Sequence, residues 1–182
     1  MKTALIVIDV QQSFEHRPYW RPEGVADFVS RLQQLIDRSR ASGVPVLQVF
    51  HEEGTGVFAR ESGFVKTLEA VRIQPTEVFH KNVHSSLFAR SASGQSLETW
   101  LRENGIEHVI VTGIRTEQCC ETTARHASDS GFKVTYALDA TLTFPMVAKS
   151  GRTYSAADIM ERTALVLQDR FANVVNADAV VV

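Results

Sequence analysis

Two adjacent cysteines are the residues best suited to nucleophilic chemistry, and they are the only cysteines in the chain. Cys119 and Cys120 lie in the stretch GIRTEQCCETTAR, which follows an apolar run of strand length and has the pattern of a helix start. If Thr116 caps that helix, Cys119 is its third residue, among backbone N–H groups that have no helical partner. The helix dipole and a nearby cation would lower the pKa of the thiol, and the free N–H groups would stabilise an oxyanion. Cys119 is therefore the candidate nucleophile.

Cys120 is expected to have a different role. Successive helical residues are about 100° apart around the axis, so Cys120 points towards the sheet if Cys119 faces a cleft. Free cysteine is commonly a small buried residue, and for Cys119 considered alone that interpretation also stays open. Two adjacent cysteines make no useful disulfide framework, so we expect a reducing, cytoplasmic setting.

Apolar runs of strand length alternate with longer stretches of helical period. The candidate strands are 4–9, 45–50, 77–80, 108–112, 133–138 and 172–175, and the candidate helices are 25–42, 95–104, 116–130 and 155–167. Nearly continuous apolar strands are typical of sheets covered on both faces, and repeated strand–helix–strand units give parallel, right-handed connections. We predict one domain over 1–182 with a three-layer α-β-α, Rossmann-like fold and a parallel sheet of about six strands.

Polar side chains follow several of these predicted strands. They are Asp9, His51, Lys81, the loop that carries Cys119, and Asp139. Open parallel sheets bind ligands at the carboxyl ends of their strands. An acid, a base and a thiol far apart in sequence are therefore expected to meet in one crevice at this edge.

Charge and patterning exclude several classes of function. The chain has 19 basic and 21 acidic residues, so it lacks the basic excess of a general nucleic-acid or membrane-surface protein. The apolar run near the start is interrupted by Asp9 and no cleavage site follows, which predicts a strand and not a signal peptide or membrane span. No phosphate loop or dinucleotide fingerprint occurs, so no cofactor is predicted.

Three motifs together resemble the isochorismatase-like cysteine hydrolases, which include nicotinamidases, N-carbamoylsarcosine amidases and isochorismatases. ALIVIDVQQSF resembles the opening strand and D-x-Q-x-x-F of the family, and FHKNVHSSLF resembles its K-x-x-x-S-x-F segment. GIRTEQCCETTAR resembles the signature G-x-x-T-D-x-C-V-x-x-T-A-R, and the match spans about 4 to 145. Cys119 falls on the family nucleophile, and Cys120 falls where the family usually has valine.

The resemblance implies a catalytic triad of Asp9, Lys81 and Cys119. Asp9 would take the thiol proton and return it to the leaving amine, while Lys81 keeps the carboxylate and thiolate ionised. It also implies a cis peptide bond between Ile114 and Arg115 that aims the N–H groups of Arg115 and Cys119 at an oxyanion.

The activity implied is hydrolysis of a C–N bond in a small amide or ureide through an acyl intermediate on Cys119. Two alternatives stay open. One is vinyl-ether hydrolysis of the isochorismatase type, whose enzymes often lack the cysteine, and the other is a catalytically silent binding protein of the same fold. The implied partners are a small-molecule substrate and further copies of the chain, as a homodimer or larger homo-oligomer.

One departure from the family concerns metal binding. Nicotinamidases hold a metal with an Asp-x-His after the second strand and a further histidine. Here His51 can match the histidine, but Val49 stands in the place of the aspartate and no histidine follows before His80. A single imidazole with nearby carboxylates is a poor site for a borderline-soft metal, so we predict no catalytic metal.

The substrate pocket is expected to include Phe14, His51, Arg115 and Phe144. The guanidinium of Arg115 could grip a substrate carboxylate or carbonyl, project into a subunit interface, or pair with a glutamate at the cleft edge. The candidate glutamates are Glu52, Glu53 and Glu117. Tyr19 and Trp20 are expected either to form a lid over the site or to pack against another subunit.

Overall fold

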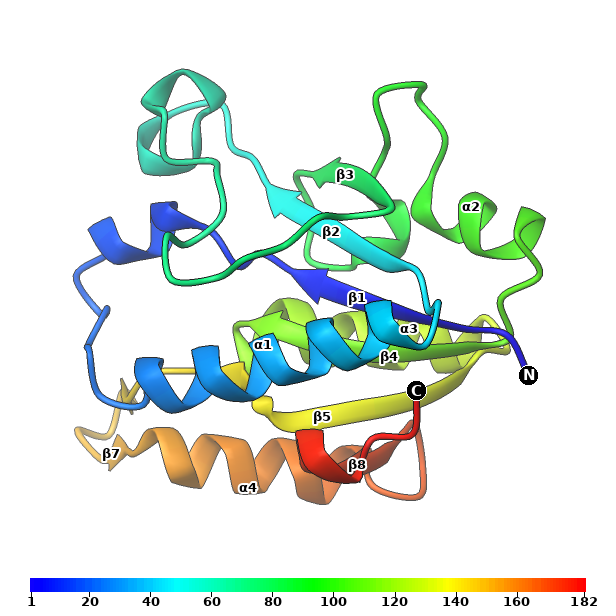
Figure 1. The fold of residues 1–182 in the computed structure, drawn as a ribbon. Helices are drawn as coiled ribbons and strands as arrows, with labels where there is room; N and C mark the ends of the chain where they lie inside the picture. The colour runs from blue at the N-terminus through cyan, green and yellow to red at the C-terminus, as the bar shows by residue number, and fades with distance from the viewer.

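The computed structural model describes residues 1–182, and its centre is a six-stranded sheet in the order β3-β2-β1-β4-β5-β8 (Figure 1). All pairings in this sheet are parallel. The strands are β1 (Thr3–Ile8), β2 (Val46–His51), β3 (Glu77–Lys81), β4 (His108–Ile114), β5 (Lys133–Leu142) and β8 (Asn173–Val175). The predicted α/β class and the number of parallel strands are confirmed.

Helices cover both faces of the sheet. α1 (Val25–Ala41) packs on one face through buried side chains three or four residues apart, among them Phe28, Leu32 and Leu35. Figure 1 shows α1 in front of the sheet and α3 behind it. The helices that contribute to the core of the opposite face are α2 (Leu97–Glu103), α3 (Glu121–Asp129) and α4 (Ala156–Leu167).

The position of β1 inside the sheet, between β2 and β4, explains why its sequence is continuously apolar. Leu5 and Val7 belong to the core beneath α1, whereas Ala4, Ile6 and Ile8 belong to the core on the other face. Each of these side chains is fully buried. Alternate residues of a strand point to opposite faces, so a strand covered on both sides needs apolar residues at every position.

Serine caps fix where two of the helices begin. The side chain of Ser96 accepts a hydrogen bond from the backbone N–H of Thr99 at the start of α2. Ser155 and Asp158 form a reciprocal capping box at the start of α4. Such caps satisfy N–H groups that have no partner within the first turn, so these two boundaries follow directly from the sequence.

β5 is longer than predicted and changes one expectation about the site. The strand continues to Leu142 after a register shift against β4 between Val111 and Gly113. Asp139 therefore lies within the strand and not at its end. Its carboxylate accepts a hydrogen bond of 2.6 Å from the backbone N–H of Ala177, so it holds the C-terminal segment and takes no part in the site.

The stretch after β5 also contains a small antiparallel hairpin that the sequence patterns did not predict. It is formed by β6 (Met146–Val147) and β7 (Thr153–Tyr154). Strands of two residues are too short to show a period of two in the sequence. No helix in the structure is long and apolar enough to cross a membrane.

His108 should make the stability of the fold sensitive to acid. Its ring nitrogens lie 3.1 Å from Thr3 Oγ1 and 2.8 Å from Thr135 Oγ1, and burial, assisted by Lys133, lowers the pKa of His108. The unfolded chain then binds a proton at a higher pH than the folded protein does. The free energy of unfolding should therefore decrease as the pH falls below about 6.5, the ordinary pKa of histidine.

Urea unfolding of wild type and His108→Gln between pH 5 and pH 7 measures this contribution. The variant should lose less stability than wild type across that range, because glutamine can hydrogen-bond to the threonines and does not titrate. Equal losses in the two proteins would contradict the prediction.

Candidate active site

Three side chains from the ends of separate strands meet at the carboxyl edge of the sheet. Asp9 directly follows β1, Lys81 is the last residue of β3, and Cys119 lies in the turn after β4. Lys81 Nζ donates a hydrogen bond of 2.7 Å to Asp9 Oδ2 and lies 3.4 Å from Cys119 Sγ. All three residues are buried. The structure therefore brings together the three residues predicted as the triad.

The backbone geometry of Asp9 helps to bring its carboxylate to this point. Its φ is +53°, in the left-handed region that few residues other than glycine adopt, and its N–H donates 2.8 Å to the carbonyl of Val49. Asp9 Oδ2 is held by Lys81, whereas Asp9 Oδ1 is buried without a hydrogen-bond partner. The second oxygen is free to accept a proton.

His51 completes the group at the end of β2. Its Nδ1 lies 3.2 Å from Lys81 Nζ, and its Nε2 lies 3.5 Å from Glu53 Oε1. The side-chain amide of Gln11 pairs with both the backbone N–H and the carbonyl of His51, at 2.8 and 3.0 Å. Burial and the charge of Lys81 lower the pKa of His51, which favours a neutral ring with Nδ1 as acceptor.

The charges of the site differ from the expectation of a resting thiolate. Burial lowers the pKa of Lys81, but Asp9 and Cys119 outweigh burial and raise that pKa above its ordinary value. Burial, and then the charge of Asp9, raise the pKa of Cys119, and Lys81 offsets only part of this effect. The helix start does not dominate as predicted, because the thiol is shielded from water and faces a carboxylate. Burial and the charge of Asp9 therefore favour the neutral thiol of Cys119 over the thiolate.

The turn that carries Cys119 begins differently from the predicted cap. Thr116–Cys120 is a π-helical turn that leads into α3, and Arg115, not Thr116, is its cap. The carbonyl of Thr116 accepts 2.7 Å from the buried hydroxyl of Tyr136, and Thr116 Oγ1 lies 2.8 Å from Thr141 Oγ1. These bonds fix the turn to β5.

The peptide bond between Ile114 and Arg115 is cis, at the position that the family resemblance implies. The backbone N–H of Arg115 donates to no backbone or side-chain acceptor among the hydrogen bonds of the structure. This donor directly precedes the turn that carries Cys119, so it is available to a ligand bound beside the thiol.

A cavity of about 250 Å³ opens above Cys119. Five residues predicted from the sequence line it: Asp9, Phe14, His51, Arg115 and Cys119. Phe144 was also predicted to line the pocket and does not. Its side chain is 1% exposed and packs behind Tyr19 and Trp20, with ring centroids 5.6 and 5.2 Å away, so it supports the wall instead of forming it.

The remaining lining residues were not assigned to the pocket from the sequence, except that Tyr19 was predicted either as part of a lid over the site or as part of a subunit interface. They are Arg17, Tyr19, Glu53, Phe58, His84 and Gln118. A signal existed for some of them, because Arg17 and Tyr19 lie in the aromatic-rich segment after β1 and Phe58 lies in the long loop after β2. His84 and Gln118 carry no comparable pattern, since only the folded loop conformations bring them to the cavity.

Arg115 occupies one wall of the cavity and is 7% exposed. Its Nη2 lies 2.8 Å from Glu117 Oε1, and its guanidinium is 4.7 Å from the ring centroid of Tyr19. Glu117 Oε2 in turn accepts 2.6 Å from Thr143 Oγ1. Two of the alternatives for Arg115 are thus compatible, since it pairs with Glu117 and also faces the cavity. Tyr19 lies against Arg115 as part of the same wall.

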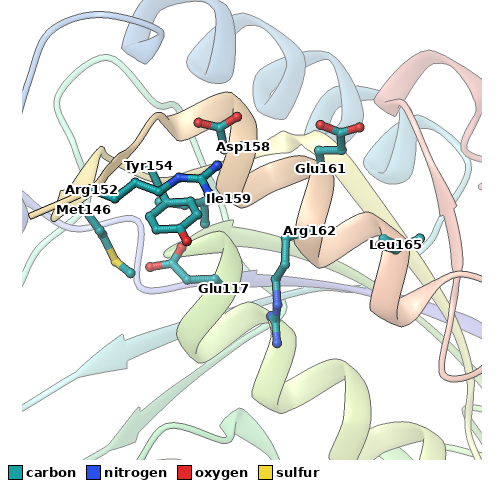
Figure 2. Close-up of a pocket in the computed structure, with 9 residues that line it drawn as sticks. All are labelled: Glu117, Met146, Arg152, Tyr154, Asp158, Ile159, Glu161, Arg162 and Leu165. Carbon is teal, nitrogen blue, oxygen red and sulfur yellow. The ribbon is translucent and has the colours of Figure 1, made fainter. Parts of the chain in front are cut away.

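A second cavity of about 550 Å³ lies beyond Glu117, between the β6–β7 hairpin and α4. Figure 2 shows Glu117 on one side of it, with Tyr154 and Arg152 of the hairpin region and Arg162 of α4 around it. It is larger than the cavity above Cys119 but contains no nucleophile, so the chemistry belongs to the smaller one. Nothing in the structure tests the predicted homo-oligomer, which stays a prediction.

Asp9, His51 and Cys119 also form the kind of cluster that can hold a metal, since their ligand atoms lie within 4.8 Å of one another. The ammonium group of Lys81 contacts all three and supplies the positive charge at their centre. Val49, in the place of the nicotinamidase aspartate, is fully buried in the core. The residues present therefore do not fit the metal site implied by that branch of the family.

Fold and site together define a three-layer α/β protein with a cysteine, an aspartate and a lysine at the carboxyl edge of its sheet. The model of the isochorismatase domain matches residues 3–177. The chain belongs to the isochorismatase family, and its relatives mark it as a hydrolase of that family.

Three similar proteins illustrate the range of these relatives. The isochorismatase family protein YrdC of Bacillus subtilis is 28% identical over 99% of this chain and 95% of its own. Nicotinamidase 3 of Arabidopsis thaliana is 29% identical over 78% of this chain and 73% of its own. The structure of a cysteine hydrolase from Pseudomonas syringae pv. phaseolicola superposes with a TM-score of 0.84 at 27% identity, covering 97% of this chain and 89% of that one.

Proposed function

We propose that this protein is a metal-independent cysteine hydrolase that cleaves the C–N bond of a small amide or ureide. The observation that carries the proposal is the arrangement around Lys81 Nζ, which lies 2.7 Å from Asp9 Oδ2 and 3.4 Å from Cys119 Sγ. A nucleophile, a proton acceptor and a cation buried together at the floor of a cavity are the components of covalent hydrolysis.

In the first half of the reaction, Cys119 Sγ attacks the amide carbon while its proton passes to Asp9. The unpartnered Oδ1 of Asp9 supports this role, because that oxygen is buried and has no competing donor. Because burial raises the pKa of this thiol, proton transfer accompanies the attack, and Lys81 stabilises the developing thiolate. The free N–H of Arg115 supports its assignment as an oxyanion donor. Asp9 then protonates the nitrogen as the C–N bond breaks, which releases ammonia or an amine.

In the second half, water hydrolyses the thioester on Cys119, or the thiocarbamate if the substrate is a ureide. Asp9 takes a proton from the water as its oxygen bonds to the acyl carbon. The C–S bond breaks, the acid or carbamate leaves, and the sulfur recovers its proton from Asp9. Lys81 pairs with the carboxylate whenever Asp9 is ionised and so keeps the base close to the sulfur.

An ammonia-release screen over small amides, carbamoyl compounds and ureides tests the proposal. The protein should release ammonia from at least one class, and prior treatment with a chelator should leave the rate unchanged. Mass spectrometry of the intact protein during turnover should detect an acyl adduct that maps to Cys119. Turnover of isochorismate with no amide cleaved would instead support the vinyl-ether reaction, and turnover of neither would support a binding protein.

A further inference from the structure

Charged side chains surround the cavity above Cys119, and four of them are matched in ion pairs. Lys81 pairs with Asp9 at 2.7 Å, and Arg115 pairs with Glu117 at 2.8 Å. Two further charged residues line the cavity and belong to neither pair: Arg17 and Glu53. Their charges have opposite signs, and no ion pair joins them to each other.

Neither of these two charges is compensated by another side chain. Arg17 takes part in no ion pair, and its guanidinium carbon lies 5.6 Å from the ring centroid of Tyr19. The one partner of Glu53 is His51, whose Nε2 lies 3.5 Å from Oε1. Because the ammonium group of Lys81 can only donate, His51 Nδ1 accepts from it at 3.2 Å and the ring is neutral. Glu53 therefore keeps its negative charge.

The two charged residues belong to loops that one aromatic contact joins. The backbone N–H of Arg17 donates 3.0 Å to the carbonyl of Phe14, and the N–H of Glu53 donates 2.9 Å to the carbonyl of Phe58. The buried rings of Phe14 and Phe58 meet edge to face with centroids 5.1 Å apart. The two backbones are thus held relative to each other, while the exposed side chains of Arg17 and Glu53 can adjust to a ligand.

The signs of the two charges indicate the kind of ligand that fits between them. A substrate with only a carboxylate would gain from Arg17 but would be repelled by Glu53, and a substrate with only an ammonium group would meet the reverse. A zwitterion meets both charges favourably. The α-carboxylate and α-ammonium groups of a free amino acid are such a pair, and a guanidinium binds a carboxylate through two parallel hydrogen bonds.

We propose that Arg17 and Glu53 are the specificity-determining residues of this cavity, and that they bind the carboxylate and the ammonium group of a zwitterionic α-amino acid whose side chain ends in an amide or ureide. This inference rests on the proposed function, since it assigns the substrate class of the same site. Arg17 and Glu53 are exposed whereas Cys119 is buried, so the side chain of the amino acid would extend inward to the thiol. The cavity of about 250 Å³ is smaller than the roughly 300–1,000 Å³ of sites for drug-sized ligands, which suits a single amino acid.

The test uses sets of four compounds that share the reacting amide and differ in the two charges. One set is glutamine, glutaramic acid, 4-aminobutanamide and butanamide, which have both charges, the carboxylate only, the ammonium only and neither. The corresponding sets for asparagine and citrulline change the length of the chain. In the set that fits best, wild type should cleave the zwitterion with a kcat/KM about 10- to 100-fold above that of the uncharged compound, or about 3- to 10-fold for each exposed charge. Both compounds with a single charge should be cleaved less well than the zwitterion.

Two variants assign the two charges separately. Arg17→Gln should bring the ratio of glutamine to 4-aminobutanamide to about one, because these two compounds differ only in the carboxylate. Glu53→Gln should do the same for the ratio of glutamine to glutaramic acid, which differ only in the ammonium group. A merely structural role would lower the rates of all four compounds together. Should one variant fail to fold, the ranking in wild type and the other variant still decide the matter.

A control variant and a change of salt show whether the preference comes from these particular charges. Arg170→Gln removes one positive charge beside Lys133, the first residue of β5, and should leave every ratio unchanged. Raising the ionic strength from about 0.01 M to about 0.5 M should reduce the preference for the zwitterion, because salt screens contacts between exposed charges.

Calorimetry with the Cys119→Ala protein keeps the inference separate from the proposed function. Zwitterion binding that is lost on adding Arg17→Gln, in a protein whose wild type releases no ammonia, would support the recognition site and reject the hydrolase. Hydrolysis of butanamide as fast as glutamine would do the reverse. A wild-type preference for glutaramic acid, or a preference for glutamine that persists in both variants, would overturn the inference.

Discussion

Replacing Cys119 with alanine should reduce amide hydrolysis by about 10⁴-fold or more, the loss typical of removing a nucleophile from a catalytic triad. The variant should fold normally, because the change removes only one sulfur atom, at the edge of a cavity. Ammonia release by wild type and variant, with the best substrate of the screen, measures the effect. The adduct detected by mass spectrometry should disappear together with the activity.

Cys120 provides a matched control one residue away. Its side chain is fully buried in the core beside Ala124 and Ala127, and it does not line the cavity. Cys120→Ala should lower the free energy of unfolding by about 1 kcal/mol through lost burial and leave the rate of hydrolysis near that of wild type. Full activity in Cys119→Ala, or equal losses in both variants, would reject Cys119 as the nucleophile.

The convergence of the site could be predicted because it depends on topology. Parallel strands end at one edge, so Asp9, Lys81 and the turn with Cys119 had to approach one another once the strands were placed. The predicted strand ends differ from the observed ones by one or two residues for β1 to β4. An error of that size does not move a side chain to the other end of the sheet.

The remaining features depend on contacts that have no local pattern. Asp139 followed a predicted strand, yet the register shift carries β5 past it to Leu142, and that shift is set by pairing with β4. Phe144 is correspondingly displaced behind the wall of the pocket. The protonation of Cys119 depends on how deeply the thiol is buried and on its distance from Asp9, neither of which the helix-start pattern contains.

The sequence also could not predict which glutamate pairs with Arg115. The sequence offered several glutamates as partners, among them Glu52 and Glu117. In the structure Glu52 is engaged by Arg60 and lies beside His80, which leaves Glu117 to pair with Arg115. Residues two apart within a helix do not face each other. Arg115 can still pair with Glu117 because it is the cap of the turn and has an extended backbone conformation.

Among the glycines of the chain, Gly113 should be the one at which a change to alanine is most damaging. Gly113 pairs with Ile8 across β1 and β4 and has a φ of +124°, which residues with a side chain rarely adopt. A Cβ atom placed there would lie 2.0 Å from the carbonyl oxygen of Ile8 and 2.7 Å from its nitrogen. Both are backbone atoms, so relief requires the two central strands to separate. We expect the free energy of unfolding to fall by at least about 4 kcal/mol, from strain in φ and overpacking together.

Gly131→Ala separates the clash from the backbone strain. Gly131 also has a positive φ, +88°, but a Cβ there would meet no atom within 4 Å. This control should therefore lose only about 1–2 kcal/mol, the cost of the left-handed conformation. Urea unfolding of the two variants gives the comparison, and any folded Gly113→Ala protein should hydrolyse amides poorly, because Ile8 directly precedes Asp9. Equal destabilisation by both substitutions would mean that β1 and β4 can move apart at little cost, and that Asp9 is not held in place by their close contact.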